Sequence, residues 1–249
     1  MIQDTISKKD SVLSESSKKM IEVGVFYGRK KSKTNPKMRK FVYGSHNGFN
    51  IIDIQKTEEM LEEALKFVKE KAKNNSLFLF VGTEPSAEEE IISIAKAFDM
   101  PYVVDRWVGG TITNFPIISK RVEFLKNTRE ALNSGSLGGY TKKERLDMEK
   151  DIAKLEKLMG GLENLSKVPD VLIVINPVSH LSAVREANKI NIPVVALANI
   201  DADPDMISYC VPGNDKAKNS IAWFLENIKA AIEEGIKERA SVASEPVLK

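Results

Sequence analysis

The stretch DVLIVIN, Asp170–Asn176, carries five consecutive aliphatic residues between an acid and an amide. A strand with one face in water alternates apolar and polar side chains, so this unbroken run predicts a strand buried on both faces. Three further runs have the same character, and one more is a short candidate: Ser76–Gly82, Pro101–Val104, Pro193–Asn199 and Tyr209–Val211. Helical patterns separate most of them, so the sequence predicts an α/β fold, a parallel sheet with helices on both faces.

Between the predicted strands at Pro101–Val104 and Asp170–Asn176, the alternation of strands and helices stops. Apolar residues recur there at helical spacing in two runs, separated by the glycine-rich segment NSGSLGGY, Asn133–Tyr140. The two runs are Ile118, Val122, Leu125 and Leu132, then Ile152, Leu155, Met159 and Leu162. They predict an antiparallel coiled-coil hairpin inserted over residues 116–165, with two ordinary surface helices as the alternative. The pair Gly160-Gly161 would end the second helix.

Length and composition bound the kind of protein. The chain has 249 residues, 42% of them hydrophobic and 29% charged, which suits one α/β domain with a sizeable core. Cys210 is the only cysteine, so an intrachain disulfide is excluded and a reducing compartment is favoured. No apolar run approaches the ~20 residues of a membrane helix, and the N-terminus lacks a secretory pattern. We expect a cytosolic protein without a membrane partner, with one domain over residues 18–239 and flexible segments at 1–17 and 240–249.

The net charge of +2 hides a concentrated basic segment, the basic arm (residues 28–40). The arm contains no acid and seven cations: Arg29, Lys30, Lys31, Lys33, Lys37, Arg39 and Lys40. Subtracting these seven charges from +2 leaves −5 for the rest of the chain. The Asn35-Pro36 turn signal and the apolar strand that follows favour a docked segment over a solvated run or a nuclear-localisation signal. Because clustered cations repel one another unless a polyanion neutralises them, the arm predicts salt-sensitive binding to nucleic acid.

A hairpin and a helix follow the arm. FVYGSHNGFNIIDI, Phe41–Ile54, predicts two short strands around the turn Asn47-Gly48. His46 and Asn47 at this turn are weaker candidates for RNA contacts. The next amphipathic segment, Thr57–Lys73, predicts a helix with Thr57 as its N-cap.

A second candidate phosphate site is RWVGGTITNF, Arg106–Phe115. Adjacent glycines let backbone N–H groups converge on an anion, and hydroxyl, amide and guanidinium groups add further donors. The candidate residues are Arg106, Gly109, Gly110, Thr111, Thr113 and Asn114. The alternative is that Trp107 and Phe115 pack into the core while the glycines only permit a sharp turn; the two interpretations are compatible.

An enzyme that binds a phosphorylated metabolite at the carboxyl edge of the sheet is the competing function. The first loop at that edge, Val81–Glu89, has neither of the usual glycine-rich nucleotide patterns, and its glutamates would repel a pyrophosphate. No nucleophile elbow accompanies His46 or His180, and Cys210 lies in an apolar run. A third hypothesis is an interaction scaffold that uses only the inserted hairpin.

No metal site or cofactor is predicted. The segment NIDADPD begins like a calcium loop, but Met206 stands where that loop requires glycine and Pro212 where it requires a bidentate glutamate. A solvated turn is favoured there, with casual magnesium binding as the alternative. One cysteine and two distant histidines do not make a closed zinc site.

Several of these segments together resemble the bacterial small-subunit ribosomal protein two family (the S-two family). They occur in that family's order over about residues 18–237: Thr34–Gly44, His46–Thr57, Leu79–Thr83, Asp105–Phe115, Leu155–Leu162, Pro169–Pro177, Glu186–Asp205 and Val211–Asp215. The segment DRWVGGTITNF is the most specific of them.

The resemblance implies a flavodoxin-like (Rossmann-like) domain with a protruding coiled-coil hairpin and no catalysis. It implies a cytoplasmic, ribosome-associated structural protein that binds small-subunit rRNA and neighbouring small-subunit proteins, among them the mRNA-binding ribosomal protein one. The basic arm and the Arg106–Asn114 loop are then the expected phosphate contacts.

The chain departs from the family pattern in two places. Histidines are common around the phenylalanine-glycine pair before the arm, where this chain has Phe26 and Arg29, so no metal or RNA contact of those histidines is carried over. Many members have a basic residue after VGT, where this chain has Glu84, which puts an RNA contact by that loop in doubt.

Overall fold

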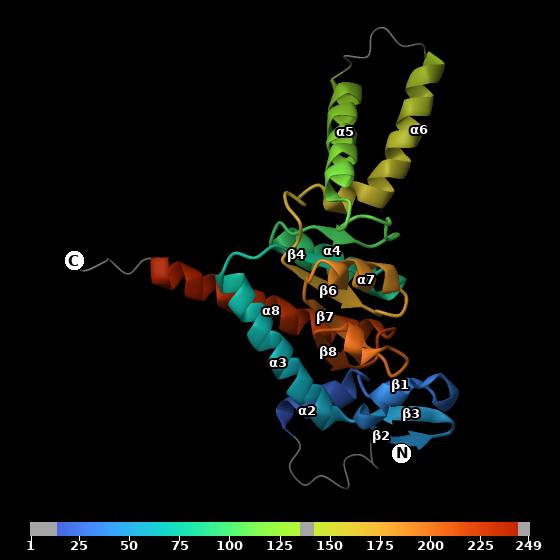
Figure 1. Ribbon diagram of the computed structural model, residues 1–249, viewed down its shortest axis with the longest axis vertical. Helices are drawn as coiled ribbons and strands as arrows, with labels where there is room; N and C mark the ends of the chain where they lie inside the picture. Colours follow the sequence, from blue (N-terminus) through green and yellow to red (C-terminus); the bar gives the residue numbers. More distant parts are fainter. Residues whose placement is uncertain (1–13, 135–141, 244–249) are drawn as a thin grey trace, which may run out of the picture.

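The computed structural model describes residues 14–134 and 142–243, an elongated molecule with two helices projecting at one end and a small sheet at the other (Figure 1). Its centre is a five-stranded parallel sheet with strand order β5-β4-β6-β7-β8. The strands are β4 (Phe78–Val81), β5 (Tyr102–Val103), β6 (Val171–Ile175), β7 (Val194–Ala198) and β8 (Tyr209–Pro212). In order of appearance this is 2-1-3-4-5, the flavodoxin-like arrangement, and it confirms the predicted fold class.

Two apolar cores lie against the two faces of this sheet, because alternate strand residues point to opposite sides. Phe78 and Phe80 face one core, which α3 (Ile54–Lys73), α4 (Pro85–Ala97) and α8 (Lys218–Ala243) cover. Leu79 and Val81 face the other core, which includes residues of α7 (Leu181–Lys189), the base of the inserted helices and the basic arm. All side chains of β4, β6 and β7 are buried, as their unbroken apolar runs require.

A small antiparallel sheet, order β1-β3-β2, lies beyond β8 at the lower end of Figure 1. Its strands are β1 (Tyr27–Lys30), β2 (Val42–His46) and β3 (Phe49–Ile52). Asn47 and Gly48 have φ of 49° and 81°, the two positive values of the predicted tight hairpin turn. The hairpin is therefore confirmed, but the start of the arm forms a third strand that the sequence does not predict.

The insertion between β5 and β6 consists of α5 (Phe115–Asn133) and α6 (Lys142–Met159). Ile118, Val122 and Leu125 of α5 are buried at its base together with Ile152 and Met159 of α6. The glycine pair ends α6, as predicted, and a side chain at Gly161 would run into the backbone and ring of Tyr102. Most of the predicted glycine-rich turn lies outside the described residues, and the coiled-coil character of the pair stays a prediction.

Several predicted boundaries need correction. Helix α2 (Glu15–Glu22) begins inside the predicted flexible extension, because Ser14 caps it and Ser17 is buried and donates to Glu58. Helix α8 continues to Ala243, into the predicted tail. The N-cap of α3 is Asp53, not Thr57, whose hydroxyl lies within hydrogen-bonding distance of the carbonyl oxygens of Asp53 and Pro212. Within the described ranges, no helix is both long and apolar enough to span a bilayer.

Candidate nucleic-acid interface

The basic arm begins with a cation that faces the protein rather than solvent. The guanidinium of Arg29 donates to Asp215 at 2.8 Å and to Asp201 at 3.3 Å, and its side chain is only 19% exposed. Asp215 is fully buried, and this burial raises the pKa of its carboxyl to about 6 although the guanidinium opposes the shift. Arg29, predicted as an RNA contact, therefore anchors the arm to the α/β domain.

A second cation of the arm also has carboxylate partners. The ammonium of Lys37 lies 2.6 Å from Asp205 and 3.0 Å from Asp203, and its hydrogen bonds to these carboxylates raise its pKa. The backbone N–H of Asn35 donates to the carbonyl of Ile200 at 2.8 Å. The aspartates of NIDADPD therefore hold the basic arm, instead of forming the free solvated turn that the sequence favours.

Apolar anchors complete the docking of the arm. Met38 is fully buried and Phe41 nearly so, because the short helix η2 (Pro36–Phe41) turns both side chains into the second core. The side chain of Asn35 accepts from the N–H of Lys37 and starts this helix as a cap. The arm is thus a docked segment with a fixed backbone, as predicted.

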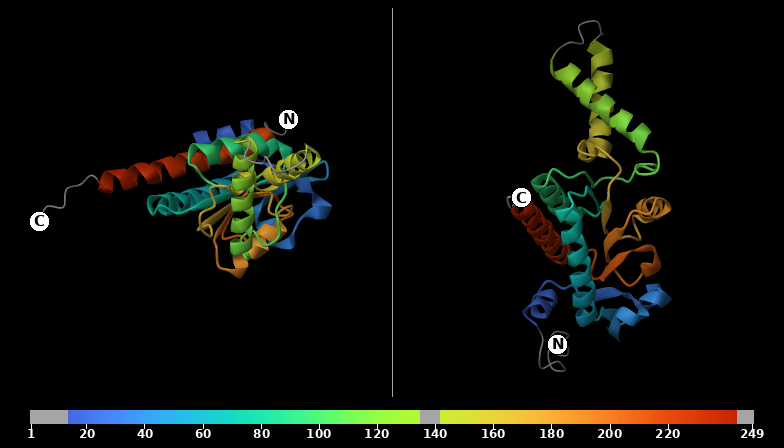
Figure 2. Two further views of the ribbon diagram at one scale, coloured as in Figure 1. Left: turned by 90° about the horizontal axis from the view of Figure 1, so that it is seen from above. Right: turned by 60° about the vertical axis from the view of Figure 1, so that its left-hand side comes forward.

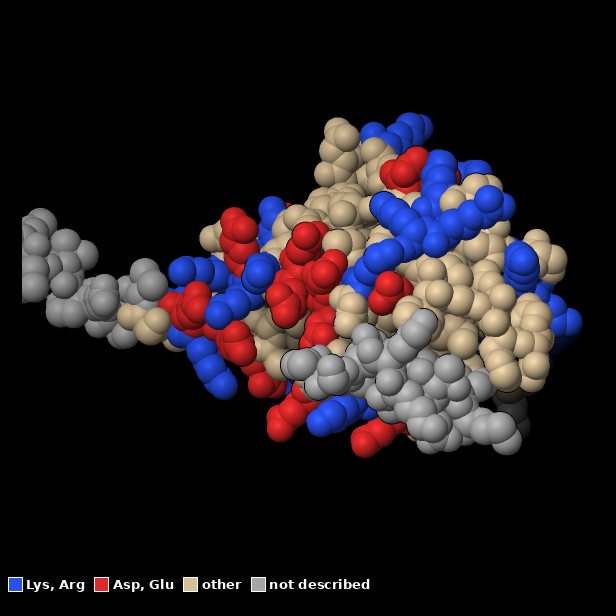
Figure 3. Space-filling view, turned by 90° about the horizontal axis from the view of Figure 1, so that it is seen from below, with Lys and Arg blue, Asp and Glu red and all other residues tan. Residues whose placement is uncertain are grey.

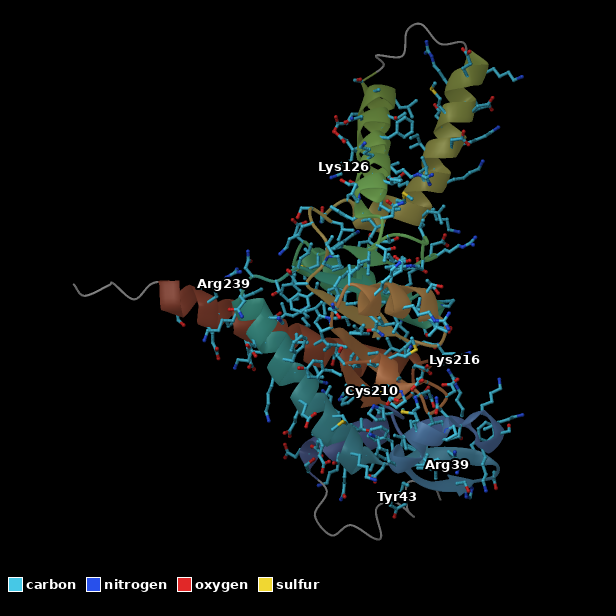
Figure 4. All side chains as sticks on the ribbon, viewed as in Figure 1. Arg39, Tyr43, Lys126, Cys210, Lys216 and Arg239 are labelled. Atoms are coloured by element: carbon cyan, nitrogen blue, oxygen red, sulfur yellow. The ribbon has the colours of Figure 1, made fainter. Side chains whose placement is uncertain are left out.

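Five cations of the arm remain exposed and have no ion pair within residues 14–134 and 142–243: Lys30, Lys31, Lys33, Arg39 and Lys40. A hollow of about 520 Å³ between the arm and β2 and β3 is lined by two of them, Lys31 and Arg39, and by Thr34, Ser45 and Asn50. Figure 4 places Arg39 at this end of the molecule, and Figure 3, which looks at the same end, shows Lys and Arg predominating on one side, while Asp and Glu are mixed with Lys and Arg on the other.

The turn between β2 and β3, at Asn47-Gly48, lies beside the arm. Lys31 donates its backbone N–H to the carbonyl of Gly48 at 3.0 Å, so His46 and Asn47 are close to the exposed cations. Lys30, Phe49 and His46 are register partners across β1, β3 and β2, and all three are exposed. The fold therefore brings the predicted hairpin candidates and the arm together on one surface.

The loop Arg106–Asn114 has an anion already, the carboxylate of Glu186 on α7. One oxygen accepts from the indole N–H of Trp107 at 3.0 Å and from the N–H of Gly110 at 2.8 Å. The other accepts from the N–H groups of Ile112 and Thr113 at 3.2 and 3.3 Å, and the Thr113 hydroxyl is 3.2 Å from it. Burial opposes the charge of Glu186, but these hydrogen bonds together hold its pKa below the usual range.

This arrangement narrows the predicted phosphate contacts of the loop. Gly110 and Thr113 donate to Glu186, and Thr111 is fully buried with its hydroxyl bonded to the carbonyl of Val108. Arg106, Gly109 and Asn114 are exposed. Trp107 and Phe115 pack against the second core, as the structural alternative states. In Figure 1 α7 lies between this loop and the arm, so the two candidate sites are separate surfaces.

The carboxyl edge of the sheet, where a doubly wound fold binds ligands, is occupied by a histidine. His180 is buried where the chain leaves β6, with Nδ1 2.9 Å from the carbonyl oxygen of Asn176 and Nε2 3.1 Å from the N–H of Thr83. Asn176 donates in turn to Glu84 at 2.9 Å. Burial lowers the pKa of His180, so its ring is neutral at pH 7 and serves as a structural bridge between β4 and β6.

Other candidates for chemistry are inert or isolated. Cys210 is buried, which raises the pKa of its thiol to about 12. Over the described parts of the chain, no three His, Cys, Asp or Glu side chains are grouped as a metal site requires.

The sequence interpretation missed the acidic partners of the interface: Glu186, Asp201, Asp203, Asp205 and Asp215. The alternating aspartates after β7 are a visible signal, although it suggests a cation rather than an arm. Glu186 gives no local signal, because it lies in an ordinary amphipathic helix.

A docked arm with exposed cations is typical of structural proteins that contact nucleic acid. A family model described as Ribosomal protein S2 matches residues 20–235, and the chain belongs to this family of structural, non-enzymatic ribosomal proteins. Similar relatives include small ribosomal subunit protein uS2 of Geotalea uraniireducens (strain Rf4), 41% identical over 89% of this chain and 87% of the relative. The protein of the same name from Nocardia farcinica (strain IFM 10152) is 39% identical over 91% and 80% of the two chains.

Proposed function

We propose that this protein binds small-subunit rRNA through the basic arm and the adjoining hairpin turn, as a cytoplasmic, ribosome-associated component of the small subunit. The main observation behind the proposal is that the cations of the arm fall into two groups, one paired with carboxylates of the protein and one exposed to solvent. Arg29 and Lys37 hold the arm on the acidic loop, while five further cations are exposed, two of them, Lys31 and Arg39, in the hollow beside β2. An arm fixed before binding loses little conformational entropy on binding, which favours affinity.

The contacts proposed are with the RNA backbone. Lys30, Lys31, Lys33, Arg39 and Lys40 supply charge, and His46 and Asn47 supply exposed side chains beside them. Cations that neutralise phosphates release condensed counterions, and phosphate contacts position a protein without reading sequence. Specificity then comes from the shape of the rRNA surface. Arg106, Gly109 and Asn114 are a second proposed contact on the far side of α7.

Neighbouring small-subunit proteins are the second class of partner, and the mRNA-binding ribosomal protein one is included in the proposal. Support comes from the inserted helices, where Phe124 is 58% exposed and lines a groove of about 410 Å³ with Met148 and Leu155. Exposed apolar grooves of this kind are typical of protein contacts.

The experiment replaces the two cations of the hollow, Lys31→Gln with Arg39→Gln, and measures binding to purified small-subunit rRNA over a range of salt concentrations. We expect weaker binding and a salt slope smaller by about 2, since each lost phosphate contact removes about 0.9. The matched control, Lys66→Gln with Lys229→Gln, removes the same charge from exposed sites on α3 and α8 and should bind normally. Unchanged binding by the first variant would reject the arm as the RNA surface.

A further inference from the structure

The loop before α5 is wrapped around one side chain of another helix. Five donors, from Trp107, Gly110, Ile112 and Thr113, converge on the two carboxylate oxygens of Glu186. Three of these donors are backbone N–H groups, so the contact fixes the path of the main chain and not only side-chain positions. Gly110 has φ of +87°, a left-handed value that glycine adopts without strain and that turns its N–H toward the carboxylate.

The bound segment runs directly into α5. The N–H of Asn114 donates to the carbonyl of Gly110 at 2.8 Å, and the N–H of Ile118 donates to the carbonyl of Asn114. The first turn of α5 is therefore continuous with the loop that Glu186 holds. Since α7 packs on the central sheet, the carboxylate ties the start of the inserted hairpin to the body of the protein.

Lys126 and Arg129 of α5 also contact Glu163, but Glu163 directly follows the end of the α6 segment, so these hydrogen bonds join the two inserted helices to each other. The ion pair between α6 and the loop after β5 is more exposed. Lys157 of α6 is 3.3 Å from Asp105, with side chains 72% and 34% exposed. Pairs of that exposure are weak, because water and salt screen them. The apolar contacts of Ile118, Val122 and Leu125 attract without a preferred direction. Hydrogen bonds are directional, so the hydrogen bonds to Glu186 can fix the angle between α5 and the central sheet.

We infer that Glu186 is the positioning residue that fixes the direction of the α5–α6 hairpin relative to the central sheet. The hairpin is the part of the molecule that extends farthest from the sheet (Figure 1), so a small change of angle at the loop displaces its far end by much more. The inference does not depend on RNA binding and is tested on the free protein.

The test measures the distance between spin labels on cysteines introduced at Glu149 of α6 and Lys66 of α3, two exposed positions on the hairpin and the body. The native Cys210 is buried and does not interfere. The doubly labelled parent should give one narrow distance distribution. Glu186→Ala should broaden it at least two-fold, and Glu186→Gln should broaden it less, since the amide keeps one acceptor oxygen.

Two controls separate position from stability. Glu123→Gln removes the same charge from an exposed site on α5 and should leave the distribution narrow. Ile228→Val lowers stability through the core on the opposite face of the sheet and should also leave it narrow. If Glu186→Ala does not fold, Glu186→Gln carries the test alone. A parent-like distribution in a folded Glu186 variant would overturn the inference, as would equal broadening in Ile228→Val.

Discussion

The imidazole of His180 accepts a hydrogen bond from the backbone N–H of Thr83 at 3.1 Å and so joins the carboxyl ends of β4 and β6. These neighbouring strands flank the point where the order of a doubly wound sheet reverses, the place where such folds bind cofactors and substrates. Here the chain fills that place with its own buried side chain. The fold is that of many enzymes, but its usual site of chemistry has become part of the scaffold.

His180→Leu removes the acceptor of the Thr83 N–H and the donor to Asn176. We expect a loss of about 1–3 kcal/mol in the free energy of unfolding, measured with urea at pH 7.5. Burial lowers the pKa of His180 in the folded state from 6.5. Below pH 6.5 the unfolded state therefore binds a proton at this residue more readily than the folded state does, which stabilises the unfolded state. The parent therefore loses this contribution as the pH falls, and the difference between the two proteins should be smaller at pH 5.5. A constant difference would contradict this account.

Arg29→Met leaves the buried carboxylate of Asp215 without its cation. Breaking a buried pair on one side is costly, and we expect a loss of about 3 kcal/mol at pH 8. Because the folded pKa of Asp215 is about 6 and its ordinary value is 3.8, Asp215 is protonated in the folded state of both proteins well below pH 6. The penalty should shrink between pH 8 and pH 5 in urea titrations. Lys37→Met, at an exposed pair, should change stability little.

Glu186 should contribute less to the stability of the fold as the pH falls, because its pKa is lowered in the folded state. Glu186→Gln tests this. The folded pKa of Glu186 is below 4.5, so its charged hydrogen bonds stabilise the fold above that pH and are lost as the pH falls through the folded value. We expect the variant to be less stable by about 2 kcal/mol at pH 7 and to approach the parent in acid. Thermal unfolding from pH 7 to pH 3.5 checks this, and a gap that widens in acid would count against it.

Gly161→Ala places a methyl group against Tyr102, whose ring carbon would lie 2.7 Å from it. The neighbouring backbone carbonyl cannot move freely, so we expect a loss of about 1–3 kcal/mol from overpacking. Gly109→Ala is the matched control, because nothing lies within 4 Å of its added carbon. Equal stability of the two variants in urea would show that the base of the hairpin tolerates the extra volume.

The elements that local physics decides were predictable. The three fully buried strands β4, β6 and β7 are visible in the sequence as unbroken apolar runs. Asn47-Gly48 marks a turn because both residues adopt positive φ readily. Phe26 and Tyr27 give no such signal, and the strand that begins at Tyr27 exists because it pairs with β3. Its pairing is a tertiary contact that no local pattern encodes.

The sequence predicted the cations of the candidate site, but it did not predict which carboxylates pair with them. Lysines of the arm are alike in sequence, yet Lys37 is paired and Lys31 is exposed, which depends on where Asp203 and Asp205 lie 166 residues or more along the chain. The glycine loop shows the same limit: its pattern predicts a phosphate contact, and it gives no sign that Glu186 of the same chain accepts from the loop's N–H groups.

The packing of α3 on α8, visible from two sides in Figure 2, has a consequence for how the chain is made. Gly235 of α8 approaches the backbone of Lys69 on α3 closely, while the apolar residues Leu61 and Val68 are buried in the same core as α8. Helix α3 is synthesised long before α8, and at about 5–20 residues per second the delay is roughly 7–30 s. During that time its apolar side lacks the cover that α8 gives it. Nascent chains of this protein should therefore need protection from aggregation until the last helix emerges.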